Sequence, residues 1–195
     1  MKTLLAITAF AAITGIASAE TLLEDDFSMQ TLPARRAMRG EWAFKENAAI
    51  CTQDDALYRE HKNHGPIIFF TLGYQDATIR MSYKAEAARS VVFTCNNDKG
   101  HVFRFVSSDK GTTIRAYPAD SPDHTSVELA RGPALKSGEW TDLEVAISGS
   151  KVTLKIGKDF AQTVEHPGIS AAKTNFSIGF AFGTFSVKGV KVAKP

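Results

Sequence analysis

The sequence predicts an all-β fold, an antiparallel sandwich or barrel, and three observations support this. Hydrophobic and polar residues alternate at every second position over most of the chain, while helical spacing is hard to find. Gly, Asn, Asp and Pro interrupt the alternation at short intervals, as tight turns require. About a dozen short strands without an internal repeat are typical of a sandwich or barrel.

The expected strands follow one another closely along the chain. The first two form a hairpin at residues 41–52, EWAFKENAAICT, in which KEN is the turn. The others are expected at residues 66–73, 77–87, 90–97, 101–108, 112–119, 125–130, 139–148, 151–157, 161–166, 176–183 and 185–193. NNDKG, SSDKG and SGS are good hairpin connections, because Asn, Asp and Gly tolerate positive φ.

The alternation also assigns faces to the strands. The set expected in the core is Leu143, Val145, Ile147, Val152, Leu154, Ile156, Phe176, Ile178, Phe180 and Phe182. Asp142 and Glu144 then lie on the opposite, outward face, where Lys155 of the next strand can neutralise them. Such exposed carboxylates are expected to be a solvated strand face rather than the acid and nucleophile of a glycosidase.

Residues 1–19 are expected to be a secretory signal peptide. Lys2 supplies the positive start, residues 4–16 form an apolar run, and Ala17-Ser18-Ala19 is a suitable cleavage site. The run is too short to span a membrane, and no later stretch is long enough. Residues 20–195 are therefore predicted to be a single domain that is exported to the periplasm or the medium.

Composition excludes some classes of partner. The 23 basic and 21 acidic side chains nearly cancel, so a nucleic-acid partner is not expected. The basic cluster of Arg35, Arg36 and Arg39 is expected to be a solvated loop. Cys51 and Cys95 could form a disulfide in an exported protein or remain free thiols.

Several segments resemble one known family. LEDDFS, GEWAFKENAAI, HGPIIFFTLGYQDATIRMSYKAE, GEWTDLEVAISGSKVTLKIGKDF and FSVKGVKVA occur in this order. They resemble the concanavalin A-like (laminin G-like) jelly-roll superfamily, and within it the secreted bacterial 3-keto-disaccharide hydrolase family. The resemblance implies a jelly roll of two antiparallel sheets. It also suggests a structural Ca²⁺ at Asp25 and Asp26, although two acids are few ligands for that ion, and otherwise no cofactor.

No position matches a catalytic motif, so the catalytic residues are left unknown. Ligands of this superfamily lie across a sheet face or at a rim, and the alternation predicts which residues could line such a face. The candidates are Arg80, Asn96, Arg104, Arg115 and Tyr117. Planar donors and an aromatic ring suit a saccharide, and arginine also suits carboxylate or sulfate. Trp42 and Trp140 are instead expected to pack against the sandwich edge.

Three functions remain open at this point. The first is an exported module that binds a poly- or oligosaccharide without cleaving it. The second is a hydrolase of 3-keto-glycosides, in which a single base such as Glu60, Glu86, Glu128 or a histidine would suffice. The third is a structural surface or envelope protein without a small ligand. The sequence does not indicate an oligomeric state.

Overall fold

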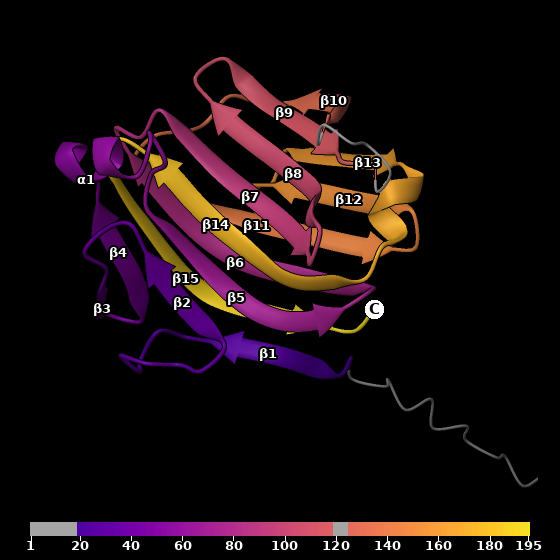
Figure 1. Ribbon diagram of the computed structural model, residues 1–195, viewed down its shortest axis with the longest axis horizontal. Coiled ribbons are helices and arrows are strands. Elements are labelled where there is room, and N and C mark those ends of the chain that lie inside the picture. Colours follow the sequence, from indigo (N-terminus) through magenta and orange to yellow (C-terminus); the bar gives the residue numbers. More distant parts are fainter. Residues whose placement is uncertain (1–18, 119–124) are drawn as a thin grey trace, which may run out of the picture.

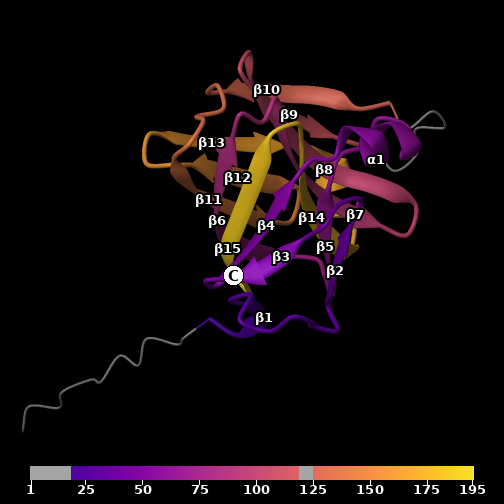
Figure 2. The ribbon, with the colours of Figure 1, turned by 90° about the vertical axis from the view of Figure 1, so that its left-hand side faces the viewer.

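The protein is a sandwich of two antiparallel sheets. A computed structural model describes residues 19–118 and 125–195, so all of the expected signal peptide except Ala19 lies outside the described residues. One sheet faces the viewer in Figure 1 and the other lies behind it, and Figure 2 shows the two layers side by side. The predicted all-β sandwich is confirmed.

The eight-stranded sheet has the order β13-β12-β11-β6-β15-β4-β3, with β1 pairing to β15. Its last strand in sequence, β15, therefore lies in the interior of the sheet. The bounds are β1 (Thr21–Asp25), β3 (Ala43–Lys45), β4 (Ala48–Thr52), β6 (Ala77–Glu86), β11 (Trp140–Ser148), β12 (Lys151–Ile156), β13 (Phe160–Glu165) and β15 (Thr184–Ala193).

The seven-stranded sheet has the order β10-β9-β8-β7-β14-β5-β2. The bounds are β2 (Arg35–Met38), β5 (Ile67–Tyr74), β7 (Ser90–Asn97), β8 (Gly100–Ser108), β9 (Gly111–Ala116), β10 (Val127–Gly132) and β14 (Lys173–Ala181). The edge strands β10 and β13 approach each other across the sandwich, which closes that side of it.

Tight turns connect most neighbouring strands. Glu46 and Asn47, with φ of 54° and 55°, form the predicted turn between β3 and β4. Phe182 and Gly183 form the two-residue turn between β14 and β15, with φ of 66° and 63°. Positive φ at both central residues defines a type I′ turn. Phenylalanine is unusual in this position, and here its ring packs against Tyr58 and under the Arg89 guanidinium.

Four short elements were not predicted. One of them is β1, which precedes the first expected strand. Strand β2 occupies the segment expected to be a basic loop, and Arg35 within it is buried, so that expectation is wrong. Helix α1 (Asp55–Glu60) begins after Asp54, whose carboxylate accepts the backbone N–H groups of Ala56 and Leu57. A 3₁₀ turn, η1 (Pro167–Ser170), precedes β14. No helix in the described part of the chain is both long and apolar enough to cross a membrane.

The core lies between the sheets and is rich in aromatic rings. The Phe176 ring stacks on the Phe70 ring and on the Phe93 ring. Of the ten residues expected in the core, all are buried except Ile156 and Phe182, which are half-buried. Ile156 ends its strand, and Phe182 belongs to the turn described above. Trp42 packs edge-on against Phe180 as expected, whereas Trp140 is 43% exposed, so its predicted packing is wrong.

The two cysteines are buried free thiols. Cys51 belongs to β4 of the eight-stranded sheet and Cys95 to β7 of the seven-stranded sheet. The structure therefore favours the free-thiol alternative over a disulfide. Burial raises the pKa of the Cys95 thiol from 9.0 to about 11.

This shift predicts a loss of stability at alkaline pH. The contribution of Cys95 to the free energy of unfolding is complete below pH 9. It is lost as the pH rises towards 11, because in that window the thiol ionises readily only in the unfolded protein. Between pH 8 and pH 10.5, wild type should lose about 2 kcal/mol more unfolding free energy than Cys95→Ala. The full shift of about two pKa units is worth about 2.7 kcal/mol, and part of it is lost only above pH 10.5. Urea titrations at both pH values measure this, and equal losses in the two proteins would contradict it.

Candidate functional site

The structure divides the five residues that were predicted to share one surface. Arg80 lies on β6 in the eight-stranded sheet, whereas Asn96 and Arg104 lie on β7 and β8 in the seven-stranded sheet, and Arg115 and Tyr117 lie on or just beyond β9. The single shared surface is therefore wrong in its inclusion of Arg80. The error arose because β6 and β7 are consecutive in sequence but belong to different sheets.

The outward face of the seven-stranded sheet carries a line of side chains in register across all of its strands. The line consists of Arg36, Phe69, Ser177, Thr94, Arg104, Arg115 and Glu128. At the usual strand spacing it is roughly 29 Å long. Its middle members, Thr94 and Ser177, are small and only 3% and 2% exposed. The larger Phe69 and Arg104 stand on either side of them.

A chain of hydrogen bonds crosses this face, which we call the His101 cluster (Thr94, Asn96, His101, Arg104 and Asn175). Arg104 donates from its terminal nitrogen to His101 Nε2 at 2.7 Å and from Nε to Thr94 Oγ1 at 3.1 Å. A guanidinium only donates, so His101 Nε2 accepts and Nδ1 carries the proton. Nδ1 donates to Asn96 Oδ1 at 2.7 Å, and the Asn96 amide donates to Asn175 at 2.7 Å.

Aromatic rings and further arginines border the cluster. The Tyr117 ring lies 5.1 Å from the His101 ring and 5.9 Å from the Arg104 guanidinium. At the other side, Arg36 covers the Phe69 ring at 5.3 Å. Arg115 pairs with Glu128 at 3.5 Å, a carboxylate that it shares with Arg131. Arg104 has no carboxylate partner among the described residues.

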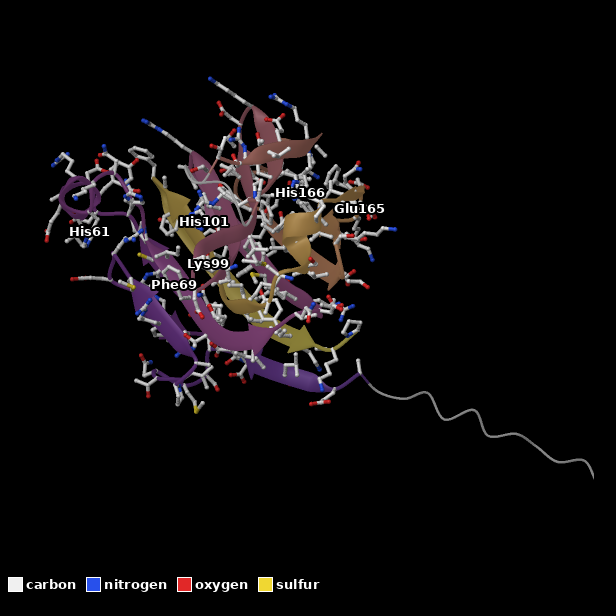
Figure 3. The ribbon with its side chains drawn as sticks, turned by 45° about the vertical axis from the view of Figure 1, so that its right-hand side comes forward. His61, Phe69, Lys99, His101, Glu165 and His166 are labelled. Atoms are coloured by element: carbon white, nitrogen blue, oxygen red, sulfur yellow. The ribbon has the colours of Figure 1, made fainter. Side chains whose placement is uncertain are left out.

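Thr94, His101 and Asn175 are members of the cluster that were not among the predicted site residues, and for His101 the reason is a β-bulge. A register shift opposite Asn96 places His101 on the outward face, where strict alternation would put it in the core. Asn175 follows the alternation, since it lies two residues before Ser177 on the same face and pairs with Asn96, but the expected strand began only at residue 176. Figure 3 shows His101 and Lys99 beside the β7–β8 turn and Phe69 on β5. Alternation alone carries no signal of a bulge.

The other sheet places Asp142 and Glu144 as predicted, on its outward face. Glu144 bonds Arg80 at 2.7 Å and Lys155 at 2.8 Å. Asp142 accepts a hydrogen bond from the Ser82 hydroxyl at 2.6 Å. The hydrogen bond from Lys155, with Arg80 assisting, lowers the pKa of Glu144. A glycosidase acid needs a raised pKa instead, so the strand is a paired, solvated face.

Neutralising these two acids should therefore have little effect. We expect Asp142→Asn to change the unfolding free energy by less than about 0.5 kcal/mol, and Glu144→Gln by at most about 1 kcal/mol, since exposed ion pairs contribute little. Neither change should affect any turnover. Urea unfolding and an activity assay test this, and a hundredfold loss of activity would restore a catalytic role.

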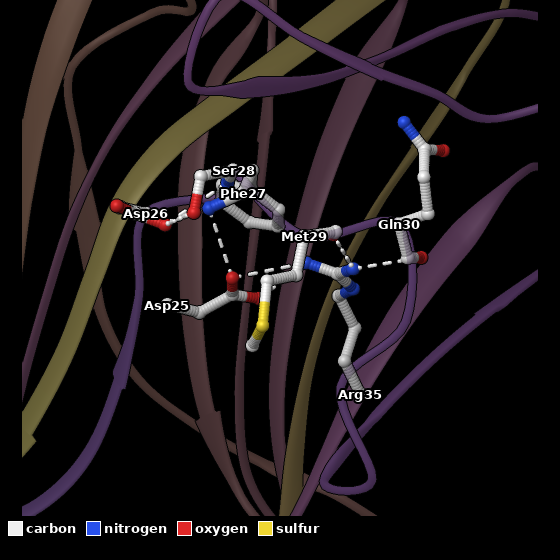
Figure 4. A network of polar contacts seen from close by, with 7 residues as sticks. All are labelled: Asp25, Asp26, Phe27, Ser28, Met29, Gln30 and Arg35. Atoms are coloured by element: carbon white, nitrogen blue, oxygen red, sulfur yellow. Dashed lines mark hydrogen bonds and ion pairs between the residues drawn. The ribbon is translucent and has the colours of Figure 1, made fainter.

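The proposed calcium ligands have other partners (Figure 4). Asp25 accepts the Arg35 guanidinium through both carboxylate oxygens, at 2.9 and 2.8 Å, and the Phe27 backbone N–H at 2.9 Å. Asp26 accepts from the Ser28 hydroxyl and backbone N–H. The guanidinium supplies the positive charge that Asp25 requires. An ion would have to displace it, so the contacts of this pair do not support the calcium hypothesis.

Comparisons with known proteins show a similar fold. The sequence matches no protein-family model and has no significant match among curated proteins. Among solved structures, the carbohydrate-binding module CBM66 from Bacillus subtilis aligns with a TM-score of 0.60 and 10% identity, over 83% of this chain and 96% of that one. The transglycosylase Crh5 aligns with a TM-score of 0.66 and 11% identity, over 90% and 85% of the two chains. Alginate lyase A1-II′ aligns with a TM-score of 0.52 and 13% identity, over 77% and 81%.

The protein has the fold of an all-β jelly roll of two antiparallel sheets. Its structural neighbours include carbohydrate-binding modules, polysaccharide lyases and glycosyl hydrolases. At these identities the similarity establishes the fold alone. The finer resemblance to the 3-keto-disaccharide hydrolase family stays a prediction, since no family model matches.

Proposed function

We propose that this jelly roll is an exported module that binds a poly- or oligosaccharide on the outward face of its seven-stranded sheet without cleaving it. The observation that carries the proposal is the His101 cluster beside Tyr117. Hydrogen bonds hold its side chains in fixed positions, so binding a ligand costs them little conformational freedom. Solved structures with this fold include proteins named as a carbohydrate-binding module and an alginate lyase, which also favours a carbohydrate ligand.

The chemistry of the face fits a sugar chain. Tyr117 offers aromatic surface to the CH face of a sugar ring, and the amides and guanidinium bond hydroxyl groups. Arg104 lacks an acidic partner in the described part of the chain, which favours a glycan that carries carboxylate or sulfate groups. Binding of such a glycan should weaken as salt is added.

The contacts of the candidate bases favour binding over hydrolysis. The His101 cluster contains no carboxylate, and both ring nitrogens of His101 are engaged in hydrogen bonds. Of the candidate bases, Glu86 pairs with Lys84, and Glu128 pairs with Arg115 and Arg131. We therefore favour saccharide binding over hydrolysis of 3-keto-glycosides as the function. A chromogenic 3-keto-glucoside should remain intact with the wild-type protein, and turnover would favour the hydrolase.

Isothermal titration with alginate, pectate and dextran tests the proposal. Arg104→Ala should weaken binding of the acidic chains at least tenfold, because a charge-assisted hydrogen bond contributes about 1.5–3 kcal/mol. Tyr117→Ala should also weaken binding. Because neither side chain is in the core, the melting temperatures should stay close to wild type.

Arg80→Ala is the matched control, since Arg80 is an exposed arginine on the opposite sheet. Its binding should equal that of wild type. Unchanged binding in both Arg104→Ala and Tyr117→Ala would discard this face. Absence of binding to every polysaccharide would favour the purely structural alternative.

A further inference from the structure

A cavity of about 520 Å³ lies at one end of the sandwich, between the sheets. Its lining includes Tyr83 of β6 and Thr141 of β11 from one sheet, and Ser107 of β8 and Thr112 of β9 from the other. Ser107 and His101 occupy opposite ends of β8, roughly 20 Å apart at the usual rise per residue. The cavity is therefore separate from the His101 cluster, and its volume is within the range of small-molecule sites.

The floor of this cavity is made of buried hydroxyl groups. Tyr83 and Ser107 are each 1% exposed, and Thr112 and Thr141 are also buried. Thr112 donates its only hydroxyl proton to the Pro133 carbonyl at 2.7 Å. The 2.7 Å bond between Ser107 and Thr112 must then run from Ser107 to Thr112. Ser107 consequently has only an acceptor to offer to a ligand.

Tyr83 provides the complementary group. Its hydroxyl makes no hydrogen bond with any residue of the described ranges, although the side chain is almost completely buried. Burial raises the pKa of Tyr83 to about 12, so the hydroxyl keeps its proton. Tyr83 lines the cavity, so its hydroxyl is free to donate to water or a ligand there. Tyr83 and Ser107 thus present an unfilled donor and an unfilled acceptor to the cavity.

The walls and mouth narrow the class of ligand. Phe160 packs directly on Gly132, where an added Cβ would lie only 2.9 Å from Phe160 Cζ, and with Leu135 it forms an apolar wall. Trp140 is exposed at the mouth. The charged residues of the lining balance in sign: Arg131, Lys136 and Lys158 against Glu139, Asp142 and Asp159. This balance disfavours a charged ligand, and the hydroxyl floor disfavours an alkyl chain.

We propose that this cavity is a second binding site, for a neutral mono- or disaccharide, either free or as the end of a longer chain. Sugar hydroxyls would bond Tyr83 and Ser107, while an apolar ring face would lie on Phe160. This site goes beyond the proposed function, since it uses none of the residues of the His101 cluster.

Nuclear magnetic resonance titration of the full chain tests the inference. The probes are glucose, galactose, mannose, fructose, sucrose, maltose and trehalose at millimolar concentration. At least one should shift the Trp140 indole and Gly157 amide resonances. Tyr83→Phe keeps the shape of the ring, and Ser107→Ala keeps the bond from Thr112 to Pro133. Each should raise the Kd about tenfold, as expected for the loss of one hydrogen bond.

Tyr117→Phe and Arg104→Ala are the controls, and both should bind the small sugar as wild type does. A neutral glucan that shifts Trp140 at the same concentration of chain ends would identify chain ends as the ligand, and shifts with free sugars alone would identify free sugars. The inference is overturned if no probe shifts these resonances, or if Tyr83→Phe and Ser107→Ala both bind like wild type. Polysaccharide binding lost in Arg104→Ala would still support the proposed function in that case.

Discussion

Replacing Arg35 by alanine should lower the free energy of unfolding by about 3–5 kcal/mol, the usual cost of leaving one partner of a buried ion pair alone. The Arg35 and Asp25 side chains are only 2% and 4% exposed. The guanidinium also donates to the carbonyls of Met29 and Gln30 at 2.6 and 3.0 Å, and it stacks 4.1 Å above the Phe44 ring. The substitution would leave a buried carboxylate and two carbonyls without their donor.

Lys194→Ala is the matched control for this experiment. Its ammonium is also 2.8 Å from a carboxylate, that of Glu20, but both side chains are more than half exposed. Its loss should be at most about 1 kcal/mol. The double variant Asp25→Asn/Arg35→Met should recover part of the stability lost in Arg35→Ala, because it removes both charges. Equal urea midpoints for Arg35→Ala and Lys194→Ala would contradict the assigned role.

The second large effect is expected for Gly183→Ala, at about 2–5 kcal/mol of unfolding free energy. The backbone has φ of 63°, which costs an L-residue about 1–2 kcal/mol. An added Cβ would also collide with the carbonyl oxygen of Glu86 and lie 2.7 Å from that of Ala87. Overpacking of this kind costs about 1–3 kcal/mol.

Gly149→Ala separates the two contributions. Gly149 has φ of 57°, but nothing lies within 4 Å of its added Cβ. This variant should lose only the backbone cost, about 1 kcal/mol. Equal losses at the two glycines would show that the collision with the end of β6 is relieved without cost.

The sequence predicted most of the strands because each has one buried face. In β11, Leu143, Val145 and Ile147 are buried, and in β12 the alternation holds through Val152 and Leu154. It did not predict β2, because Arg35 is a charged residue on the inward face. Its burial depends on Asp25, a residue of another strand. Such a pairing is not encoded in local periodicity.

The candidate site was predicted in part for a related reason. Asn96 and Arg104 follow the alternation and were assigned to the correct face, whereas His101 depends on a bulge. Arg80 was misplaced because alternation separates inward from outward but does not tell which sheet a strand joins. The cavity at Tyr83 was invisible for the same reason, since its lining combines residues of two sheets.

The position of β15 has a consequence for the order of folding. This C-terminal strand pairs with β6, β4 and β1, so β1 and the β3–β4 hairpin have no other neighbour in their sheet. During synthesis the N-terminal strands must wait until residues 184–193 have been made before they can join the sheet. Closing so long a loop is slow, and it leaves strand edges open in the meantime. The chain should therefore stay incompletely folded until its last strand is available, and a truncation that removes β15 should leave β1, β3 and β4 without a sheet.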